Sequence, residues 1–575
     1  MKKWFKSSVF CFVIIAAASI LFAASFPNLV FKKGLPLLAW IAYIPVFWLV
    51  RRVSFVSSFF WGAIYGYAAY GLFNYWLSVF HPLAGIIVGS IYLVYMAILF
   101  PLLHLAVRLF PQRGYLLQWL FWMAFEYART LGFLGYPYGI TGYSQWNLLP
   151  VIQIASFTGV WGVSALVVFP SAWLASAINE DENKNFTTNQ HEPKQIMGNG
   201  KIKGLCCLCG SWLNSWLNKI KIFFRREWLS ALVWCTLLLT SLVYGLASPI
   251  DYSGERTVKT ALIQHNTDPW LPSRAATSAL AFEEYRRDFK ILSRLSDEAL
   301  AAHPDTDLVV WSETAFVPRI HWHTVIRDDP SAWELVRELL EYLSRQEVPF
   351  VIGNDDARKD PSINPKGNNR VDYNAAMLYD RGELRGIYRK LHLVPFTEHF
   401  PYEKQFPRIY NALVNADTHF WEKGREAVVL DSRGIKFSTP ICFEDTFGYI
   451  SRDFVRNGAE LIVNLSNDAW SSSLSCQMQH LSMAVFRAVE NRRAMVRSTS
   501  SGQTCSIDPN GRILAMAEPF TESWLVAEVP LLSGETFYTK HGDYLGKAFL
   551  AAGLLMLIIC MVSYIMNTVK RRFSD

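Results

Sequence analysis

The chain has 575 residues, of which 51% are hydrophobic, 15% aromatic and only 18% charged. Its mean hydropathy of +0.16 is positive, which argues against a purely soluble enzyme. Disorder is excluded as the dominant state because disordered chains are poor in aromatic residues and rich in charge. A net charge of +7 is modest for this length, so no nucleic-acid partner is expected.

Apolar runs of the length that spans a bilayer fill the first half of the chain and return near its end. They predict about eight transmembrane helices, at residues 9–26, 35–50, 55–80, 83–110, 115–133, 151–178, 228–247 and 548–566. A cleaved signal peptide is the alternative for the first run, since Lys2, Lys3 and Lys6 precede it and small residues lie near its end.

Lysine and arginine are concentrated in every second connection between the predicted helices. The basic segments are 51–52, 108–113, 184–226 and 570–572, and Lys32 and Lys33 are the exception on the other side. Because cytoplasmic loops carry the excess of basic residues, this pattern places both termini inside. The long polar segment 249–544 is therefore expected outside the cytoplasm.

The nine cysteines are scattered and odd in number, which predicts at least one free thiol and no disulfide framework. Cys206, Cys207 and Cys209 lack a second pair of ligands at zinc spacing. We expect no metal site and no cofactor.

In segment 249–544 short β-branched runs alternate with amphipathic helical stretches, which indicates an α/β layered domain. Strands are predicted at 258–264, 308–311, 350–353, 375–379, 435–441, 461–465 and 495–498. Helices are predicted at 277–303, 332–346 and 478–491. The predicted division is a membrane region at 1–248, a soluble domain at 249–544, and a last helix with a cytoplasmic tail at 545–575.

Three reactive side chains lie beside predicted strands or apolar runs of this domain. Glu313 directly follows one strand, Lys390 precedes a short apolar run, and Cys442 leaves another strand. Taken singly, each has an ordinary structural explanation, such as an exposed acid, a snorkelling lysine or a small buried thiol. In α/β domains, however, such positions converge on one edge of the scaffold.

As a set, these residues suit acyl transfer through a thioester. A thiol with an ordinary pKa of about 8.5 needs a base to take its proton, and a nearby cation favours the thiolate. An ordinary glutamate is about four pKa units too acidic, a mismatch of roughly 5 to 6 kcal/mol that burial must reduce. The ammonium of Lys390 would also stabilise an oxyanion formed by attack on a carbonyl.

Eight short motifs, four in each half of the chain, form a recognisable set. They are Glu126-Tyr127-Ala128-Arg129, Gly135-Tyr136-Pro137, Gly142-Tyr143-Ser144-Gln145, Gly159-Val160-Trp161-Gly162, Trp311-Ser312-Glu313-Thr314, Lys390-Leu391-His392-Leu393-Val394-Pro395-Phe396, Cys442-Phe443-Glu444 and Ser466-Asn467-Asp468-Ala469-Trp470. The second half resembles the nitrilase, or carbon-nitrogen hydrolase, superfamily, and the whole chain resembles the apolipoprotein N-acyltransferase family. The resemblance implies a polytopic α-helical membrane region plus an extracytoplasmic nitrilase-like α-β-β-α sandwich.

The resemblance also implies the roles of six residues. Glu313 would be the general base, Lys390 the oxyanion stabiliser and Cys442 the nucleophile. Glu398 and Glu444 would support the site, and Trp270 would correspond to a substrate-loop tryptophan.

The implied substrates are a phospholipid acyl donor and the N-terminal amine of a diacylglyceryl-cysteine lipoprotein. The enzyme would be a monomer in the cytoplasmic (inner) membrane, with its catalytic domain on the periplasmic face. One alternative is a membrane-tethered amidase or nitrilase that releases its acyl group to water. Another is a transporter or binding protein with a catalytically inactive outer domain, which the intact Glu-Lys-Cys set disfavours.

Two ionisable residues of a predicted membrane helix, Glu126 and Arg129, are three positions apart. Residues at this spacing share one helix face, so the pair is expected to form a direct ion pair. A structural role near the membrane surface is favoured over a role in guiding lipid headgroups.

Overall fold

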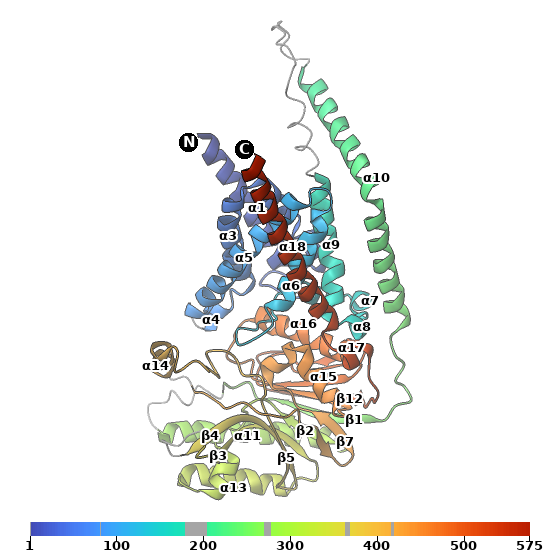
Figure 1. Ribbon diagram of the computed structural model, residues 1–575. Helices are drawn as coiled ribbons and strands as arrows, with labels where there is room; N and C mark the ends of the chain where they lie inside the picture. Colours follow the sequence, from blue (N-terminus) through green and yellow to red (C-terminus); the bar gives the residue numbers. More distant parts are fainter. Residues whose placement is uncertain are drawn as a thin grey trace.

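A computed structural model describes residues 2–80, 82–178, 204–268, 278–362, 369–415 and 419–574. A region built of helices stands on an α/β sandwich, and the chain leaves the helical region once to form the sandwich and then returns (Figure 1). Both termini lie at the end of the helical region that is far from the sandwich.

Five helices of the described residues are long and apolar enough to cross a membrane. They are α1 (Lys2–Ser25), α5 (Pro82–Leu109), α9 (Val160–Ile178), α10 (Gly204–Ala247) and α18 (Tyr544–Ser574). Figure 1 shows α10 standing apart from the other helices. Only 11% of its apolar window is buried, as expected of a helix that packs mainly against lipid.

Four of the eight predicted spans are broken or shortened in the structure, which corrects the sequence prediction. Segment 35–50 is divided between the 3-10 helix η1 (Pro36–Trp40) and the nine-residue α2 (Ile44–Arg52). Segment 115–133 is helical only in α6 (Gly114–Ala128).

The third corrected span, 151–178, begins with two single-turn helices. These are α7 (Leu149–Ile152) and α8 (Ala155–Thr158), which precede α9. Gly159 separates α8 from α9 at a φ of 64°, a left-handed conformation that glycine adopts at little cost. The segment 55–80 also forms two helices, α3 (Phe55–Phe73) and α4 (Leu77–Phe80). Hydropathy alone did not reveal these breaks, because apolar side chains continue through them.

The sandwich consists of two six-stranded sheets, each mixing parallel and antiparallel pairs. The first has the order β12-β1-β2-β3-β4-β5 and contains β1 (Thr257–Gln264), β2 (Leu308–Trp311), β3 (Phe350–Lys359), β4 (Arg370–Asp380), β5 (Glu383–Arg389) and β12 (Ser523–Pro530). The second has the order β11-β10-β9-β8-β7-β6 and contains β6 (Leu430–Ser432), β7 (Ile435–Ser438), β8 (Leu461–Ser466), β9 (Ala494–Thr499), β10 (Cys505–Ile507) and β11 (Ile513–Met516).

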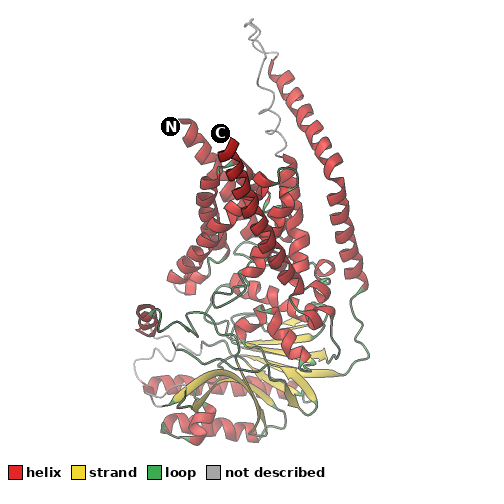
Figure 2. Ribbon diagram, in the orientation of Figure 1, coloured by secondary structure: helices red, strands yellow, loops and turns green. Residues whose placement is uncertain are grey.

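Helices cover both outer faces of the sandwich, so the expected α-β-β-α layering is confirmed (Figure 2). The first sheet is covered by α11 (Ser278–Ala302) and α13 (Pro330–Ser344), and α12 (Ile320–Val325) lies beside them. The second sheet is covered by α15 (Gly448–Arg456) and α16 (Leu474–Asn491), next to the short α17 (Phe537–His541). The helix α14 (Pro407–Asn415) projects from the side and has no buried residue.

All seven predicted strands and all three predicted helices correspond to elements of that type. The sequence prediction missed β5, β6, β10, β11 and β12. Two of these have only three residues and one has four, too few to establish an alternating pattern.

Helix α16 lies between the second sheet and the helical region, and every residue from Ser475 to Asn491 is buried. Its polar side chains must therefore find partners on both sides. Gln479 donates to the carbonyls of Pro27 and Phe73 at 2.9 and 3.2 Å and accepts from Trp76 Nε1 at 3.0 Å.

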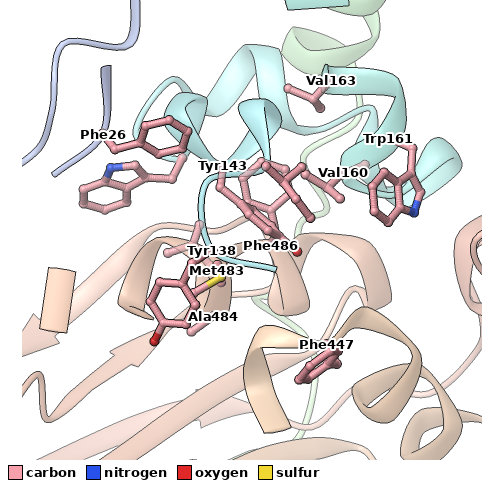
Figure 3. Close-up of a cluster of buried hydrophobic side chains, with 14 of the residues drawn as sticks. Phe26, Tyr138, Tyr143, Val160, Trp161, Val163, Phe447, Met483, Ala484 and Phe486 are labelled. Carbon is pink, nitrogen blue, oxygen red and sulfur yellow. The ribbon is translucent and has the colours of Figure 1, made fainter. Parts of the chain in front are cut away.

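Apolar side chains from both regions also form one buried cluster around α16. Figure 3 shows Tyr143 and Val160 of the helical region beside Phe486 of the sandwich. The helical region therefore packs on the sandwich as a continuous core and serves as more than a tether.

Candidate active site

The three residues predicted to carry the chemistry lie at the ends of strands of both sheets. Glu313 follows β2 and Lys390 follows β5 of the first sheet. Cys442 begins η4 (Cys442–Thr446) after β7 of the second sheet. Cys442 has a φ of 49°, which is unusual for a residue other than glycine and typical of backbone strain at functional sites.

The turn that carries Glu313 needs close contact with the neighbouring strand. A Cβ atom at Gly353 of β3 would lie 2.3 Å from the Ser312 carbonyl oxygen and 2.7 Å from the Glu313 Cα. Only glycine therefore fits at this position without moving the turn.

The Glu313 carboxylate is 5% exposed and is held at both oxygens. Its Oε1 accepts from Lys390 Nζ at 3.1 Å and from Asn374 Nδ2 at 2.8 Å. Its Oε2 accepts from the Asn467 backbone N–H at 2.9 Å. Since Asn467 follows β8, these hydrogen bonds join the two sheets at the site.

Lys390 is fully buried, and its ammonium also donates to Glu398 Oε1 at 2.8 Å. Burial alone would lower the pKa of Lys390, but Glu313 and Glu398 outweigh burial and raise that pKa well above its ordinary value. Burial raises the pKa of Glu398. Lys390 is therefore a permanent cation, which suits charge stabilisation and not proton transfer.

The Cys442 thiol lies within the field of both groups. Burial raises the pKa of Cys442 well above its ordinary value, the Glu313 carboxylate raises it further, and Lys390 lowers it. The resting thiol is therefore neutral, and attack on a carbonyl requires a base during the step.

Glu444 connects the loop after Lys390 to the loop of Cys442. Its carboxylate accepts from the backbone N–H groups of Leu391 at 2.7 Å, His392 at 3.0 Å and Ile441 at 2.8 Å. It also accepts from the hydroxyl of Tyr388. Glu444 thus holds the backbone on either side of the site, whereas Glu398 contacts Lys390 directly.

The structure leaves one of the sequence predictions untested and contradicts another. Trp270 lies outside the described residues, so its position stays a prediction. The expected direct pair between Glu126 and Arg129 is wrong: the two described side chains form no ion pair and bind the same loop instead.

That loop follows α6 and reaches the sandwich. Glu126 accepts from the Thr141 N–H at 3.1 Å, and Arg129 Nη1 donates to the carbonyls of Tyr136 and Tyr138 at 2.9 and 2.8 Å. Phe133, in the same loop, contacts other rings, at centroid distances of 5.2 Å to Phe396, 6.2 Å to Phe400 and 5.4 Å to Tyr402. Because Phe396 and Phe400 flank Glu398, the membrane region forms part of the wall of the site.

A buried charged cluster behind Cys442 was missed by sequence reasoning. His480 Nε2 lies 2.5 Å from Asp445 Oδ1 and 3.2 Å from the Cys442 carbonyl oxygen. Asp445 also pairs with Arg497, and Asp468 Oδ1 lies 3.6 Å from His480 Nδ1. These residues come from η4, α16, β9 and the loop after β8, and only the number of polar residues in α16 hinted at such a network.

The cluster holds a charged imidazole. Burial and the Arg497 guanidinium would lower the pKa of His480, but Asp445 and Asp468 outweigh them and raise it to about 9. The imidazolium is thus placed to donate to the backbone carbonyl of Cys442.

This pKa shift predicts a pH dependence of stability. Because the pKa of His480 is higher in the folded protein than in the unfolded chain, protonation of His480 stabilises the folded state. This stabilisation is complete below about pH 6.5 and is lost as the pH rises through about 9. We expect the free energy of unfolding to fall by about 3 kcal/mol across this window, measured by denaturant titration. In His480→Gln this component should disappear, while His321→Gln, at a partly exposed site, should keep it. Equal pH dependence in both variants would contradict the assignment.

Comparisons with known proteins match both halves of the chain. The family model described as carbon-nitrogen hydrolase covers residues 259–537, and the model described as apolipoprotein N-acyltransferase N-terminal domain covers residues 18–173. Among solved structures, Saccharomyces cerevisiae Nit3, a member of branch 10 of the nitrilase superfamily, is 19% identical, covers 50% of this chain and 94% of its own, and has a TM-score of 0.34.

Full-length relatives cover both regions together. Apolipoprotein N-acyltransferase 1 of Treponema denticola is 42% identical over 96% of this chain and 96% of its own. The protein of the same name from Treponema pallidum is 45% identical over 97% of each chain. Apolipoprotein N-acyltransferase of Geobacter metallireducens is 31% identical over 95% of this chain and 94% of its own. The chain therefore belongs to the apolipoprotein N-acyltransferase family.

Proposed function

We propose that the protein transfers an acyl chain from a phospholipid, through a thioester on Cys442, to the N-terminal amine of a diacylglyceryl-cysteine lipoprotein. The observation that carries this proposal is the buried Lys390 between Glu313 and Glu398, next to a thiol that the membrane region helps to enclose. Membership of the acyltransferase family supports the same reaction.

In the first step, Glu313 accepts the proton of the Cys442 thiol as the sulfur attacks the ester carbonyl of the phospholipid. The ammonium of Lys390 stabilises the oxyanion of the tetrahedral intermediate. The ester C–O bond then breaks, and the proton held by Glu313 passes to the departing lysophospholipid alkoxide. The products are a thioester on Cys442 and a free lysophospholipid.

In the second step, the neutral amine of the lipoprotein attacks the thioester carbonyl. Glu313 accepts a proton from the amine and returns it to the sulfur as the C–S bond breaks. The products are an amide and the free thiol, so the cycle needs no metal ion or redox partner. Glu398 and Glu444 serve as positioning residues in this scheme.

A transferase must keep water away from the thioester while it admits the amine. The contacts of Phe133 with Phe396 and Phe400, and of Trp76 with Trp470 at 5.9 Å, put apolar surface of the membrane region against the loops of the site. Both lipid substrates would therefore reach Cys442 from the bilayer. This arrangement favours transfer over the alternative of a membrane-tethered hydrolase.

We also propose that the domain at 249–544 lies on the outer, periplasmic face of the cytoplasmic membrane, between the membrane region 1–248 and the final helix with its tail at 545–575. The basic segments at 51–52, 108–113 and 570–572 support this orientation.

Acylation of Cys442 is the first test. After incubation with phospholipid, intact-protein mass spectrometry should show one added acyl chain that hydroxylamine removes. Cys442→Ala should reduce this signal to background, because no other thiol of the described residues lies beside Lys390, whereas Cys505→Ala should retain it. Persistence of the hydroxylamine-sensitive mass in Cys442→Ala would exclude the assignment.

The fate of the acyl-enzyme separates transferase from hydrolase. In detergent alone the thioester should decay slowly, and a diacylglyceryl lipopeptide should accelerate its loss by about a hundredfold or more, the range of a well-positioned intramolecular reaction. Mass spectrometry of the peptide should show an amide at its N-terminal cysteine. Rapid release of free fatty acid at a rate that the lipopeptide does not change would favour the hydrolase.

Orientation can be tested with an epitope inserted after Gly254, where a side chain would meet no atom within 4 Å. In spheroplasts with an intact cytoplasmic membrane, an antibody should bind this epitope, while the same epitope after Asp575 should be reached only after permeabilisation. The reverse pattern of accessibility would overturn the proposed orientation.

A further inference from the structure

A cavity of about 290 Å³ lies at the junction of the helical region and the sandwich. Neither Glu313, Lys390 nor Cys442 lines it. Its wall on the sandwich side includes Thr446 and Phe447, the last residue of η4 and the residue after it. The cavity therefore lies at the opposite end of η4 from the nucleophile.

The other walls come from the ends of membrane helices. Tyr127 of α6, Trp161 of α9 and Lys547 of α18 line the cavity. Tyrosine and tryptophan concentrate where a membrane protein meets the headgroup layer, because their rings are apolar and their tips polar. Leu131, which also lines the cavity, is 48% exposed. The cavity thus lies at the level expected for phospholipid headgroups.

Two cations at the cavity keep donors that no described residue uses. Arg452 directs Nε and Nη2 to Asp453 Oδ1 at 3.0 and 2.7 Å, and its Nη1 makes no hydrogen bond within the described chain. Lys547 is exposed, and its ammonium forms no ion pair with a described residue. Both groups can therefore accept an anionic ligand.

A third cation lies in the inner wall. Arg487 is fully buried, and it donates from Nη1 to the Thr446 carbonyl at 3.1 Å and from Nη2 to the Tyr143 hydroxyl at 3.1 Å and to Glu490 Oε1 at 2.9 Å. Its Nε has no partner among the described residues. An unpaired buried donor costs free energy, which an acceptor oxygen in the cavity would relieve.

Two acidic residues also line the cavity, and both have partners within the protein. Asp543 Oδ1 already accepts from Trp161 at 2.8 Å and from Tyr538 at 3.0 Å. Glu490 pairs with Arg487 at 2.9 Å, and burial raises the pKa of Glu490 to about 7. Arg452 and Lys547 are therefore the cations that a ligand would contact. The helix α15 also begins at Gly448 in the cavity wall, and the partial positive charge of a helix N-terminus favours an anion.

We propose that this cavity binds the phosphate group of a membrane phospholipid, at a site separate from the one that donates the acyl chain. Arg452 and Lys547 contact the phosphate oxygens, and the aromatic rings of Tyr127 and Trp161 line the path toward the bilayer. The bound headgroup lies against Thr446 and Phe447 and thereby fixes the end of η4 that is remote from Cys442. This proposal does not rest on the acyl-transfer reaction.

The test uses the full-length protein in lipid nanodiscs that contain a phosphatidylethanolamine carrying a photoreactive group on its headgroup. After irradiation, peptide mass spectrometry should find label in segments 446–452 and 538–547. Arg452→Gln/Lys547→Gln should lower this labelling about tenfold, since each lost charge-assisted hydrogen bond contributes strongly to binding. Arg456→Gln/Lys540→Gln removes the same charges from exposed positions outside the cavity and should not lower it.

Competition identifies the ligand. Phosphatidylglycerol should compete with the probe, whereas diacylglycerol, which lacks the phosphate, should not. Competition by millimolar inorganic phosphate alone would indicate a site for free phosphate and overturn the lipid assignment.

The labelling results decide whether the site exists and whether it depends on catalysis. Equal labelling in the two double variants, or the absence of label from both segments, would overturn the site. Labelling that persists in Cys442→Ala, where the thioester cannot form, would support a site independent of catalysis. Lys547→Gln alone, at an exposed position, provides a variant whose folding is not at risk and should lower labelling in the same direction.

Discussion

The ammonium of Lys390 lies fully buried between two carboxylates, and the rest of the site depends on this arrangement. A buried cation is tolerated only when it is paired and hydrogen-bonded, so Glu313 and Glu398 must stay in contact with it. The Asn467 N–H and Asn374 complete the partners of Glu313 and join the two sheets. The same charge that stabilises this packing is the charge that an oxyanion would meet. The packing of the domain and the proposed reaction therefore both require Lys390 to stay paired with Glu313 and Glu398.

The helical region takes part in the site through particular contacts. Helix α16 is buried from Ser475 to its end, with Gln479 bonded to the helical region on one side and His480 directed to the Cys442 carbonyl on the other. Glu126 and Arg129 fix the loop whose Phe133 packs against Phe396. In this protein the contacts place aromatic side chains of the helical region against the loops of the site.

The sequence was most informative where a signal is local. Seven strands and three helices were predicted from periodicity, and Glu313, Lys390 and Cys442 were singled out by their places beside strands or apolar runs. Short strands such as β6 and β10 were missed because three residues cannot show a period. The broken segments 35–50 and 151–178 were predicted as continuous because apolar side chains pass through the breaks. Asn374 was missed because the predicted strand began one residue after it.

The sequence by itself therefore determined which segments form most of the strands and helices of the sandwich, the family resemblance and the choice of Glu313, Lys390 and Cys442 as candidates. These properties follow from local patterns and short motifs, which a chain displays without being folded. Only the tertiary structure decided which carboxylates flank Lys390, that Glu126 and Arg129 bind a loop and not each other, and that His480 lies behind Cys442. It also showed the cavity that Arg452 and Lys547 line together, although these two residues are 95 positions apart in the chain. Such contacts depend on how distant segments pack together, and no local pattern encodes that packing.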